Sequence, residues 1–412
     1  MTGTLWPDPR DERAPDVDDE QQTMSQSSTE PTHRLRRVEI ISLVGAVVLA
    51  AVLLVWGSHM GRARAGTVGR FWSGGGSLLV WRSHGELVAR FTAATGSPVE
   101  RRLGDGVAAR LVAGGHRPLL LVTDVHGGHR LLDYDGTSAR WRTILASPQP
   151  HDLTNAVMAR GLVYVARSSA HGPTVVAIRR DGRTAATYRL PKLPPDPTAL
   201  LALPSRPGTG TGGASAGVGR ARVDALVAAG GRVLAVTSTR AAAGLTDLSS
   251  GRTVTFDGYV DVRAATTGGD GMVYVLAASN DPAFSQRVLR IDPRSLRIVF
   301  TFDTGVAGHG RPASALPSRF GAVFYSPGTP GSIDALSGTD LWLVDGGGLN
   351  ENSTVTSDDG ALMGPGPGDS VLLFGSPAGA AVTSVGLSDG AVRRADAHLT
   401  APSGTVVVLA AE

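Results

Sequence analysis

Oxygen-bearing side chains gather in one glycine-rich stretch, residues 345–359, which reads DGGGLNENSTVTSDD. Carboxylate and amide oxygens are hard ligands of the kind that Ca²⁺ takes. The candidates for such a site are Asp345, Asn350, Glu351, Asp358 and Asp359. Their spacing is not that of an EF-hand, and a polar loop between strands accounts for the same composition. We therefore expect no metal here. If the chain does bind a metal ion, these five residues are its candidate ligands.

Two further patterns resemble chemical motifs. The stretch DVHGGH places Asp124, His126 and His129 close together, a set that could hold Zn²⁺, but its two glycines are typical of a hairpin tip. Both GTGTGG (208–213) and GASAG (213–217) lie in a Pro/Gly-rich segment without a strand before or a helix after. Phosphate loops and nucleophile elbows require a strand–turn–helix frame. No catalytic residue can be assigned from these motifs.

Composition limits the possible functions. The chain contains no cysteine, which excludes disulfides, thiolate metal sites and cysteine nucleophiles. Its formal net charge of +3 is small, and no basic run alternates with aromatic residues, so we expect no nucleic-acid partner. The 54 glycines and 25 prolines of the 412 residues indicate many turns, and therefore many short strands.

The N-terminal part divides into three segments before the domain begins. Residues 1–37 are acidic and lack apolar periodicity, which predicts a disordered cytoplasmic tail. Residues 38–57 contain an uncharged apolar run, Ile40–Trp56, long enough to cross a bilayer. A cleaved signal peptide or a buried helix would be an alternative, but the tail before the run is long and acidic, and the run has no polar stripe. Residues 58–76 form a linker to the domain at 77–412.

Arginines flank the apolar run on both sides. Arg34, Arg36 and Arg37 precede it, whereas Arg62 and Arg64 follow it at a greater distance. The positive-inside rule then favours a single-pass protein with its N-terminus in the cytoplasm. We expect the domain after residue 76 to be extracytoplasmic, and the membrane to be a partner of the chain.

After Gly76 the chain repeats a unit of strand, loop, strand, tight turn and strand, as in LVYVARSS (162–169) and TVVAIRRDGRTAATYRL (174–190). The units recur about every 40 to 50 residues, the period of propeller blades. One interval is longer because of a Pro/Gly-rich insertion at 191–221, which we read as a flexible loop. The unit turns are Thr95-Gly96, Asp135-Gly136, Asp181-Gly182, Ser250-Gly251, Ser295-Leu296, Ser337-Gly338 and Asp389-Gly390.

Glycine at these turns suits the left-handed backbone of tight hairpins, and Leu296 breaks the pattern, which predicts a different turn there. Further β-type runs such as ARLVAGG (109–115) predict an inner fourth strand for each unit. The first unit has only linker before it, whereas the chain ends in GTVVVLAAE (404–412). We predict that this run pairs near Leu78–Trp81 and closes an all-β, seven-bladed β-propeller. A β-sandwich, the rival architecture, does not explain seven similar units.

The unit SIDALSGTDLW (332–342) resembles the A-x-D-x-x-T-G-x-x-x-W pattern of quinoprotein-like β-propeller repeats, named for pyrroloquinoline quinone. Other units keep only part of the pattern. The matching residues are Asp247, Gly251, Asp292, Asp334, Gly338 and Trp342. The resemblance implies that these residues dock neighbouring blades and are structural. Quinone enzymes of this family have larger rings and often a vicinal disulfide, so we expect a non-catalytic member without a cofactor.

Two classes of function remain open. The first is a membrane-anchored extracytoplasmic propeller that acts as a non-catalytic binding or scaffolding module for a protein or cell-envelope ligand. The second is an oxidoreductase, or another propeller enzyme, whose site is assembled from loops of several blades. We favour the first, because no catalytic constellation is recognisable in the sequence.

The predicted topology can be tested with protease added to intact spheroplasts. We expect the protease to remove the C-terminal domain and to spare the acidic tail, because the arginine cluster at 34–37 holds the N-terminus inside. Antibodies to tags at the two ends report the fragments. Protection of the C-terminal domain would reverse the predicted orientation.

Overall fold

The computed structural model describes part of the domain and, of the N-terminal segments, only residues 75–76 of the linker. The predicted tail, apolar run and linker up to residue 74, and residues 194–220 of the insertion, lie outside the described residues. Those residues are 75–149, 153–168, 172–193, 221–239, 242–279, 286–303, 314–317, 321–327, 339–345, 348–351, 362–366, 370–374, 382–386, 392–394 and 405–411. They contain no helix long and apolar enough to cross a membrane.

Every regular element in this part of the chain is a β-strand. The first sheets are built from β1 (Ser77–Ser83), β2 (Glu86–Thr92), β3 (Val99–Asp105), β4 (Ala108–Val112), β5 (Leu119–Thr123), β6 (His129–Asp135), β7 (Arg140–Ser147), β8 (Leu153–Ala159), β9 (Leu162–Arg167), β10 (Thr174–Ile178) and β11 (Thr184–Arg189). The next are built from β12 (Arg222–Ala229), β13 (Arg232–Ser238), β14 (Ala243–Asp247), β15 (Thr253–Phe256), β16 (Tyr259–Thr267), β17 (Val273–Ser279), β18 (Arg287–Asp292) and β19 (Arg297–Asp303).

The remaining strands are β20 (Ser314–Pro317), β21 (Ala322–Pro327), β22 (Thr339–Asp345), β23 (Gly348–Glu351), β24 (Leu362–Pro365), β25 (Ser370–Phe374), β26 (Val382–Gly386), β27 (Val392–Arg394) and β28 (Thr405–Ala411). Within the described residues, the strands form seven four-stranded sheets. In each sheet the neighbouring strands are antiparallel, so the all-β prediction is confirmed.

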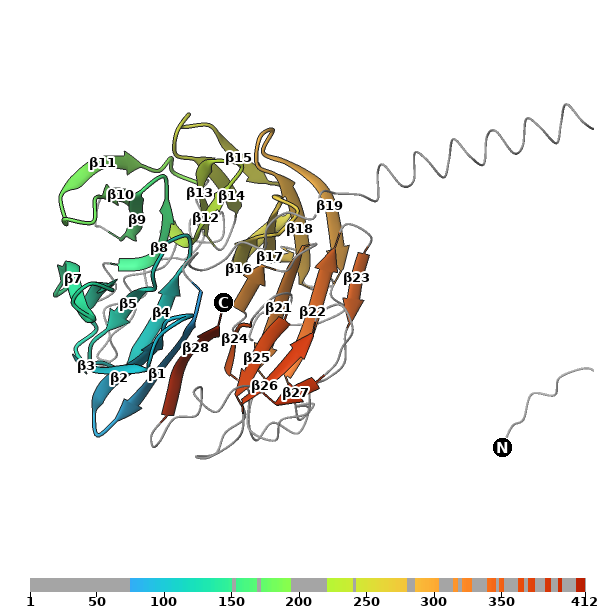
Figure 1. Ribbon diagram of the computed structural model, residues 1–412. Helices are drawn as coiled ribbons and strands as arrows, with labels where there is room; N and C mark the ends of the chain where they lie inside the picture. Colours follow the sequence, from blue (N-terminus) through green and yellow to red (C-terminus); the bar gives the residue numbers. More distant parts are fainter. Residues whose placement is uncertain are drawn as a thin grey trace, which may run out of the picture. The chain divides into compact units, whose positions relative to one another are not determined.

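The sheets stand around a common axis (Figure 1). One edge strand of each sheet contacts the corresponding strand of the next, in the cyclic order β28, β4, β8, β12, β16, β20, β24 and back to β28. The parallel bridge between Ala113 and Val157 shows that β4 and β8 run in the same direction. This arrangement of sheets, each with an inner strand beside the axis, is that of a β-propeller.

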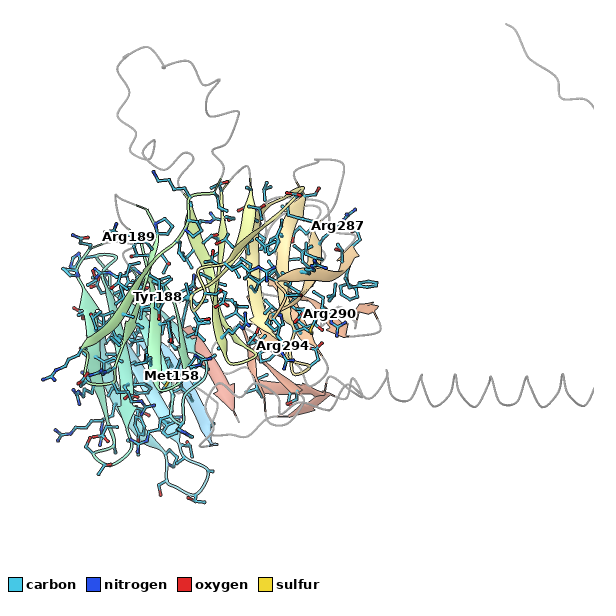
Figure 2. The ribbon with its side chains drawn as sticks, turned by 90° about the horizontal axis from the view of Figure 1, so that it is seen from above. Met158, Tyr188, Arg189, Arg287, Arg290 and Arg294 are labelled. Carbon is cyan, nitrogen blue, oxygen red and sulfur yellow. The ribbon has the colours of Figure 1, made fainter. Side chains whose placement is uncertain are left out.

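The common direction of the inner strands gives the domain two faces. We call the face where the inner strands begin the front face, and the face where they end the back face. Figure 2 shows Arg189 and Arg287 toward the front, and Met158 and Arg294 toward the back. The turn that joins the two outer strands of a sheet, such as β10–β11, therefore lies at the back face.

The C-terminal strand completes the first sheet. β28 pairs antiparallel with β1, with Leu78 opposite Ala410 and Trp81 opposite Val406. The predicted pairing of residues 404–412 near Leu78–Trp81 is therefore confirmed. Without β28, the buried side chains of Leu78 and Val80 would stand on an open sheet edge.

The hydrophobic core is divided into layers between neighbouring sheets. One layer joins the β12–β15 sheet to the β16–β19 sheet and includes Leu245, Val275 and Leu289. Further layers of the same kind separate the β4–β7 sheet from the sheets on either side. β17 is buried at every position because both of its faces meet such a layer. This explains why its sequence, VYVLAAS, lacks the polar–apolar alternation of a half-exposed strand.

Two of the back-face turns, β14–β15 and β18–β19, share one geometry. Asp247, at the end of β14, accepts hydrogen bonds from the amide and hydroxyl of Ser249, and its carbonyl accepts the amide of Gly251 at 2.8 Å. Asp292 and Leu296 form the same pair at 2.8 Å. Gly251 and Leu296 both have left-handed φ angles, 71° and 58°.

The expectation of a different turn at Leu296 was therefore wrong. The leucine side chain is fully buried in the layer between the β12–β15 and β16–β19 sheets, and this burial offsets the cost of its left-handed backbone. In the turn after β6 the left-handed residue is Ala139, with φ 50°, rather than Gly136. The register of that turn is set by Asp135, which accepts the amide of Thr137 and the hydroxyl of Ser138.

Deletion of residues 404–412 tests the closure. We expect the truncated full-length protein to aggregate or to melt at a much lower temperature, because β1 loses its partner strand and exposes its backbone edge. Thermal unfolding and light scattering provide the measurement. Deletion of residues 8–16 from the acidic tail removes the same length and serves as the control. A monomer that melts like the intact protein would show that β28 does not close the fold.

Candidate functional site

Irregularities in three inner strands place polar side chains at the front face. The pairing register shifts between Leu153 and Asn155 in β8, between Val223 and Ala225 in β12, and between Val260 and Val262 in β16. The skipped residues are Thr154, Asp224 and Asp261. A bulge leaves its extra residue outside the ladder and redirects its side chain. Because β12 contacts both β8 and β16, the three bulges lie side by side near the axis.

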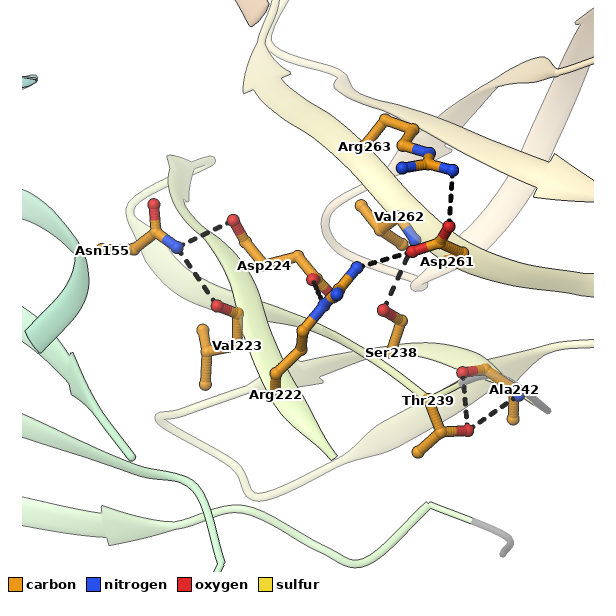
Figure 3. Close-up of polar contacts among 10 residues, drawn as sticks. All are labelled: Asn155, Arg222, Val223, Asp224, Ser238, Thr239, Ala242, Asp261, Val262 and Arg263. Carbon is orange, nitrogen blue, oxygen red and sulfur yellow. Dashed lines mark hydrogen bonds and ion pairs between the residues drawn. The ribbon is translucent and has the colours of Figure 1, made fainter. Parts of the chain in front are cut away.

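Asp224 is at the centre of this group (Figure 3). Only 6% of its side chain is exposed. The Nε of Arg222 donates to its Oδ1 at 2.5 Å. The other oxygen, Oδ2, is buried and accepts no hydrogen bond from the described residues. A buried carboxylate oxygen without a donor is costly, and such atoms are commonly satisfied by water or a ligand.

Asp261 continues the group on β16. Its Oδ1 accepts from Nη2 of Arg222 at 2.6 Å, and its Oδ2 contacts Nη2 of Arg263 at 2.7 Å. The backbone of Asp261 is left-handed, with φ 48°, which costs free energy for a residue with a side chain. The bulge also frees the amide of Val262, and this amide donates to the hydroxyl of Ser238 at 3.4 Å.

Asn155 links β8 to this group. Its side-chain Nδ2 donates to the backbone carbonyls of Val223 and Asp224, at 3.1 Å and 2.8 Å. These carbonyls lie at the bulge of β12, where the register shift interrupts the ladder. The asparagine therefore ties neighbouring sheets together at the point where Asp224 departs from its strand. We call Asn155, Arg222, Asp224, Asp261 and Arg263 the front cluster.

The electrostatics of the front cluster are dominated by Asp224. Burial raises the pKa of its carboxyl group to about 6, although Arg222 and the nearby hydroxyl of Ser238 act in the opposite direction. Two arginines and two aspartates cancel in formal charge. The Nε of Arg263 and the hydroxyl of Thr154 are also buried without a partner among the described residues. The group thus offers one unused acceptor, one unused donor and one hydroxyl.

This arrangement suits a small ligand with hydroxyl groups. A hydroxyl both donates and accepts, so one ligand group can donate to Asp224 and another can accept from an arginine. The zero formal charge of the front cluster gives no net attraction for a charged molecule. A carboxyl group with a pKa near neutrality can also exchange a proton at physiological pH, which is the property of a general base.

The metal candidates of the sequence lie elsewhere. Asp345 ends β22, and Asn350 and Glu351 lie on β23, the strand paired with it. Asp358 and Asp359 lie outside the described residues. Within the part of the chain that the structure describes, no group of three His, Asp or Glu side chains could hold a metal ion. His126 and Gly128 donate backbone amides to Asp124 in the turn between β5 and β6, as a hairpin tip predicts.

The repeat residues are spread over several sheets. Asp247 and Gly251 lie in the β14–β15 turn, Asp292 in the β18–β19 turn and Trp342 on β22, whereas Asp334 and Gly338 lie outside the described residues. Asp247 also accepts from Nη1 of Arg232 at 2.8 Å, so its partners belong to its own sheet. The bonds of Asp247 thus close a turn.

Sequence reasoning missed the front cluster. A signal was present: the dipeptide Val-Asp opens two of the inner strands, at 223–224 in β12 and 260–261 in β16. An acidic residue that recurs at the start of buried strands interrupts their apolar pattern. Such an interruption indicates a bulge or a site.

Comparisons with known proteins support the fold. A periplasmic gluconolactonase of Pseudomonas aeruginosa, PpgL, superposes with a TM-score of 0.52 at 16% identity, over 81% of this chain and 98% of that one. A putative 6-phosphogluconolactonase of Bacteroides fragilis gives a TM-score of 0.48 at 11% identity, over 82% and 97%. The β-propeller domain of Swd1 from Myceliophteria thermophila gives 0.43 at 12%, over 71% and 87%.

No protein-family model matches the chain, and no curated protein sequence does. At these identities the superposition on the gluconolactonase shows a shared fold alone. The weaker superpositions add nothing to that conclusion.

Replacement of Asp224 by Asn tests the electrostatics of the front cluster. Because its pKa is raised from 3.8 to about 6 on folding, the stability that Asp224 contributes is full below about pH 4 and is lost as the pH rises through 6. We expect the stability of the wild type relative to Asp224→Asn to fall by up to roughly 3 kcal/mol between pH 4 and 7.5. Denaturant unfolding across this range measures the difference, with Asp105→Asn as the control for loss of one carboxylate. Parallel pH curves for wild type and Asp224→Asn would contradict the raised pKa.

Proposed function

We propose that the chain is a membrane-anchored extracytoplasmic binding module, a seven-bladed propeller with quinoprotein-like repeats, that holds a hydroxylated cell-envelope ligand at the front cluster without transforming it. The ligand class that we infer is carbohydrate. The observation that carries the proposal is Oδ2 of Asp224, a buried acceptor without a donor in the described residues. The anchor and the location follow from the apolar run Ile40–Trp56 and its arginine flanks.

Two features support a site built for binding. Asp261 is held in a left-handed backbone, and the register of β16 is broken on both sides of Val262. Strain of this kind persists where the surrounding structure enforces it and is concentrated at functional sites. Asn155 then locks the bulge of β12 through two backbone carbonyls, so that Asp224 is positioned before a ligand arrives.

A second candidate function is hydrolysis of a sugar lactone. The pKa of Asp224, raised by burial to about 6, would let its carboxylate take a proton from water that attacks the ester carbon. The name of the gluconolactonase that shares the fold suggests the substrate to try. We favour binding, because the second carboxylate of the front cluster, Asp261, is engaged at both oxygens by Arg222 and Arg263, which leaves no free acid there to protonate the leaving oxygen.

Glycan-array binding by the full-length protein in detergent tests the proposal. We expect selective binding to one class of cell-envelope glycan. Asp224→Asn should weaken it about 10- to 100-fold, as expected for loss of a hydrogen bond to a charged group. Asp257→Asn, which alters an exposed carboxylate on the same face, is the matched control.

Two results would contradict this function. The first is the absence of glycan binding, or glycan binding that is unchanged in Asp224→Asn. The second is hydrolysis of glucono-δ-lactone above the uncatalysed rate that rises through pH 6 and is lost in Asp224→Asn. That second result would assign the front cluster to catalysis.

A further inference from the structure

The described residues of the back face carry an excess of positive charge. Nine exposed arginines lie in its turns or in the first three residues of an outer strand, counted over the described residues. They are Arg101, Arg140, Arg142, Arg160, Arg179, Arg183, Arg252, Arg294 and Arg297. They come from five neighbouring sheets, from the one that contains β3 to the one that contains β19. We call them the back-face arginines, and Figure 2 shows Arg294 at this end of the molecule.

Few acidic groups balance this charge. The aspartates of the β14–β15 turn and of the β16–β17 turn, Asp247 and Asp270, have side chains only 1% and 3% exposed. The more exposed carboxylates at the same positions are Glu100, Asp135 and Asp181, with side chains 50%, 44% and 49% exposed. Each contacts an arginine of its own sheet: Arg90 at 3.1 Å, Arg117 at 3.6 Å and Arg183 at 3.8 Å. Over the residues that the structure describes, the back face therefore keeps an excess of positive charge.

The front face lacks this imbalance. Within the described residues, its exposed charges are Arg82, Arg189, Lys192 and Arg222 against Asp105, Asp257 and Asp303. The two faces are built from the same kinds of turns, so a general excess of arginine on the surface does not explain the difference. Among the described residues, the excess of positive charge therefore lies at the back face.

The chain enters the domain at this same face. Ser77, the first residue of β1, pairs with Thr92, the last residue of β2, and with Ala411 at the end of β28. These ends lie at the back face, because β28 is an inner strand that finishes there. The residues before Ser77 form the linker at 58–76, which adds Arg62, Arg64 and Arg70 in sequence. The back face is thus the face at which the chain enters the domain after the predicted membrane anchor.

We propose that the back-face arginines dock the propeller on the anionic phospholipid headgroups of the membrane that holds its anchor. The proposal rests on the anchor in the proposed function. A linker of this length spans at most about 65 Å, so the tethered domain stays near the bilayer. Each arginine near an anionic surface contributes about 1 kcal/mol, and several together hold a domain against thermal motion. Docking through the back face directs the front cluster away from the bilayer.

Energy transfer in reconstituted vesicles tests this orientation. The natural chain has no cysteine, so one engineered cysteine labels a single place. Ala93→Cys marks the back face and Val125→Cys marks the front face, and both positions are exposed. In vesicles of phosphatidylglycerol and phosphatidylcholine with acceptor headgroups, we expect stronger transfer from Ala93→Cys. The difference should disappear in pure phosphatidylcholine and in 0.5 M salt, at which the Debye length is only a few ångströms.

Charge reversal identifies the residues responsible. Arg140→Glu with Arg142→Glu should lower the ratio of docked to free protein at least roughly 25-fold, which corresponds to about fivefold per lost cation. Arg179→Glu with Arg294→Glu, on other sheets, should act alike, because the effect depends on charge and not on one local contact. Arg82→Glu with Arg189→Glu makes the same change on the front face and should leave the ratio unchanged.

Several outcomes would overturn the docking. The first is equal energy transfer from both labels. The second is energy transfer that does not depend on phosphatidylglycerol or salt. The third is binding of soluble polyphosphate to the back face under conditions in which phosphatidylglycerol vesicles produce no difference in transfer between the labels. The last would assign the back face to a free polyanion. Extraction with alkaline carbonate reports the anchor separately. Release of the chain contradicts the anchored protein, whereas retention without lipid or salt dependence contradicts only the docking.

Discussion

The fold depends on one backbone ladder, the pairing of β28 with β1. Each sheet needs an inner strand beside the axis, and the first sheet obtains its own from the other end of the chain. Without that ladder the sheet would expose unpaired amides and carbonyls next to buried Leu78 and Val80. With it, every inner strand has a neighbour on both sides, and the layers between sheets continue around the axis. The regular ring then tolerates local irregularity, as in the bulges of β8, β12 and β16.

Those bulges create the candidate site within an otherwise regular ring of sheets. A regular inner strand alternates its side chains between two apolar layers, which leaves no place for an ionised carboxylate. The bulge at Asp224 redirects its side chain out of this alternation. Arg222 pairs with the carboxylates of Asp224 and Asp261, and Asn155 donates to the backbone carbonyl of Asp224. The raised pKa of Asp224 follows from the same burial. If the back face lies on the membrane, as we propose, this site opens toward the space outside it.

Much of the architecture was predictable because strands and turns leave local signals. Units such as residues 162–190 showed the strand order, and the unpaired C-terminal run indicated the closure. Leu296 was misread because its left-handed backbone is stabilised by burial against the neighbouring sheet, β12–β15, which no local pattern records. The front cluster was missed for a related reason. Asp224 and Asp261 are separated by many residues and meet only through register shifts, and neither belongs to a known motif. The stretch 345–359 was a candidate because its acidic and amide residues are close together in the sequence. The polar residues of the front cluster lie on separate strands, and only the fold brings them together.

A bulge holds the Asp224 carboxyl group buried, with one oxygen available to a ligand. A pH titration of the aspartate side-chain carboxyl carbons by ¹³C NMR tests this arrangement most directly, with the Asp224 signal assigned by its absence in Asp224→Asn. We expect a midpoint near pH 6 for this signal, well above the ordinary value of 3.8. A midpoint at or below 3.8 would show a solvated or fully paired carboxylate, and would contradict the site described for this propeller.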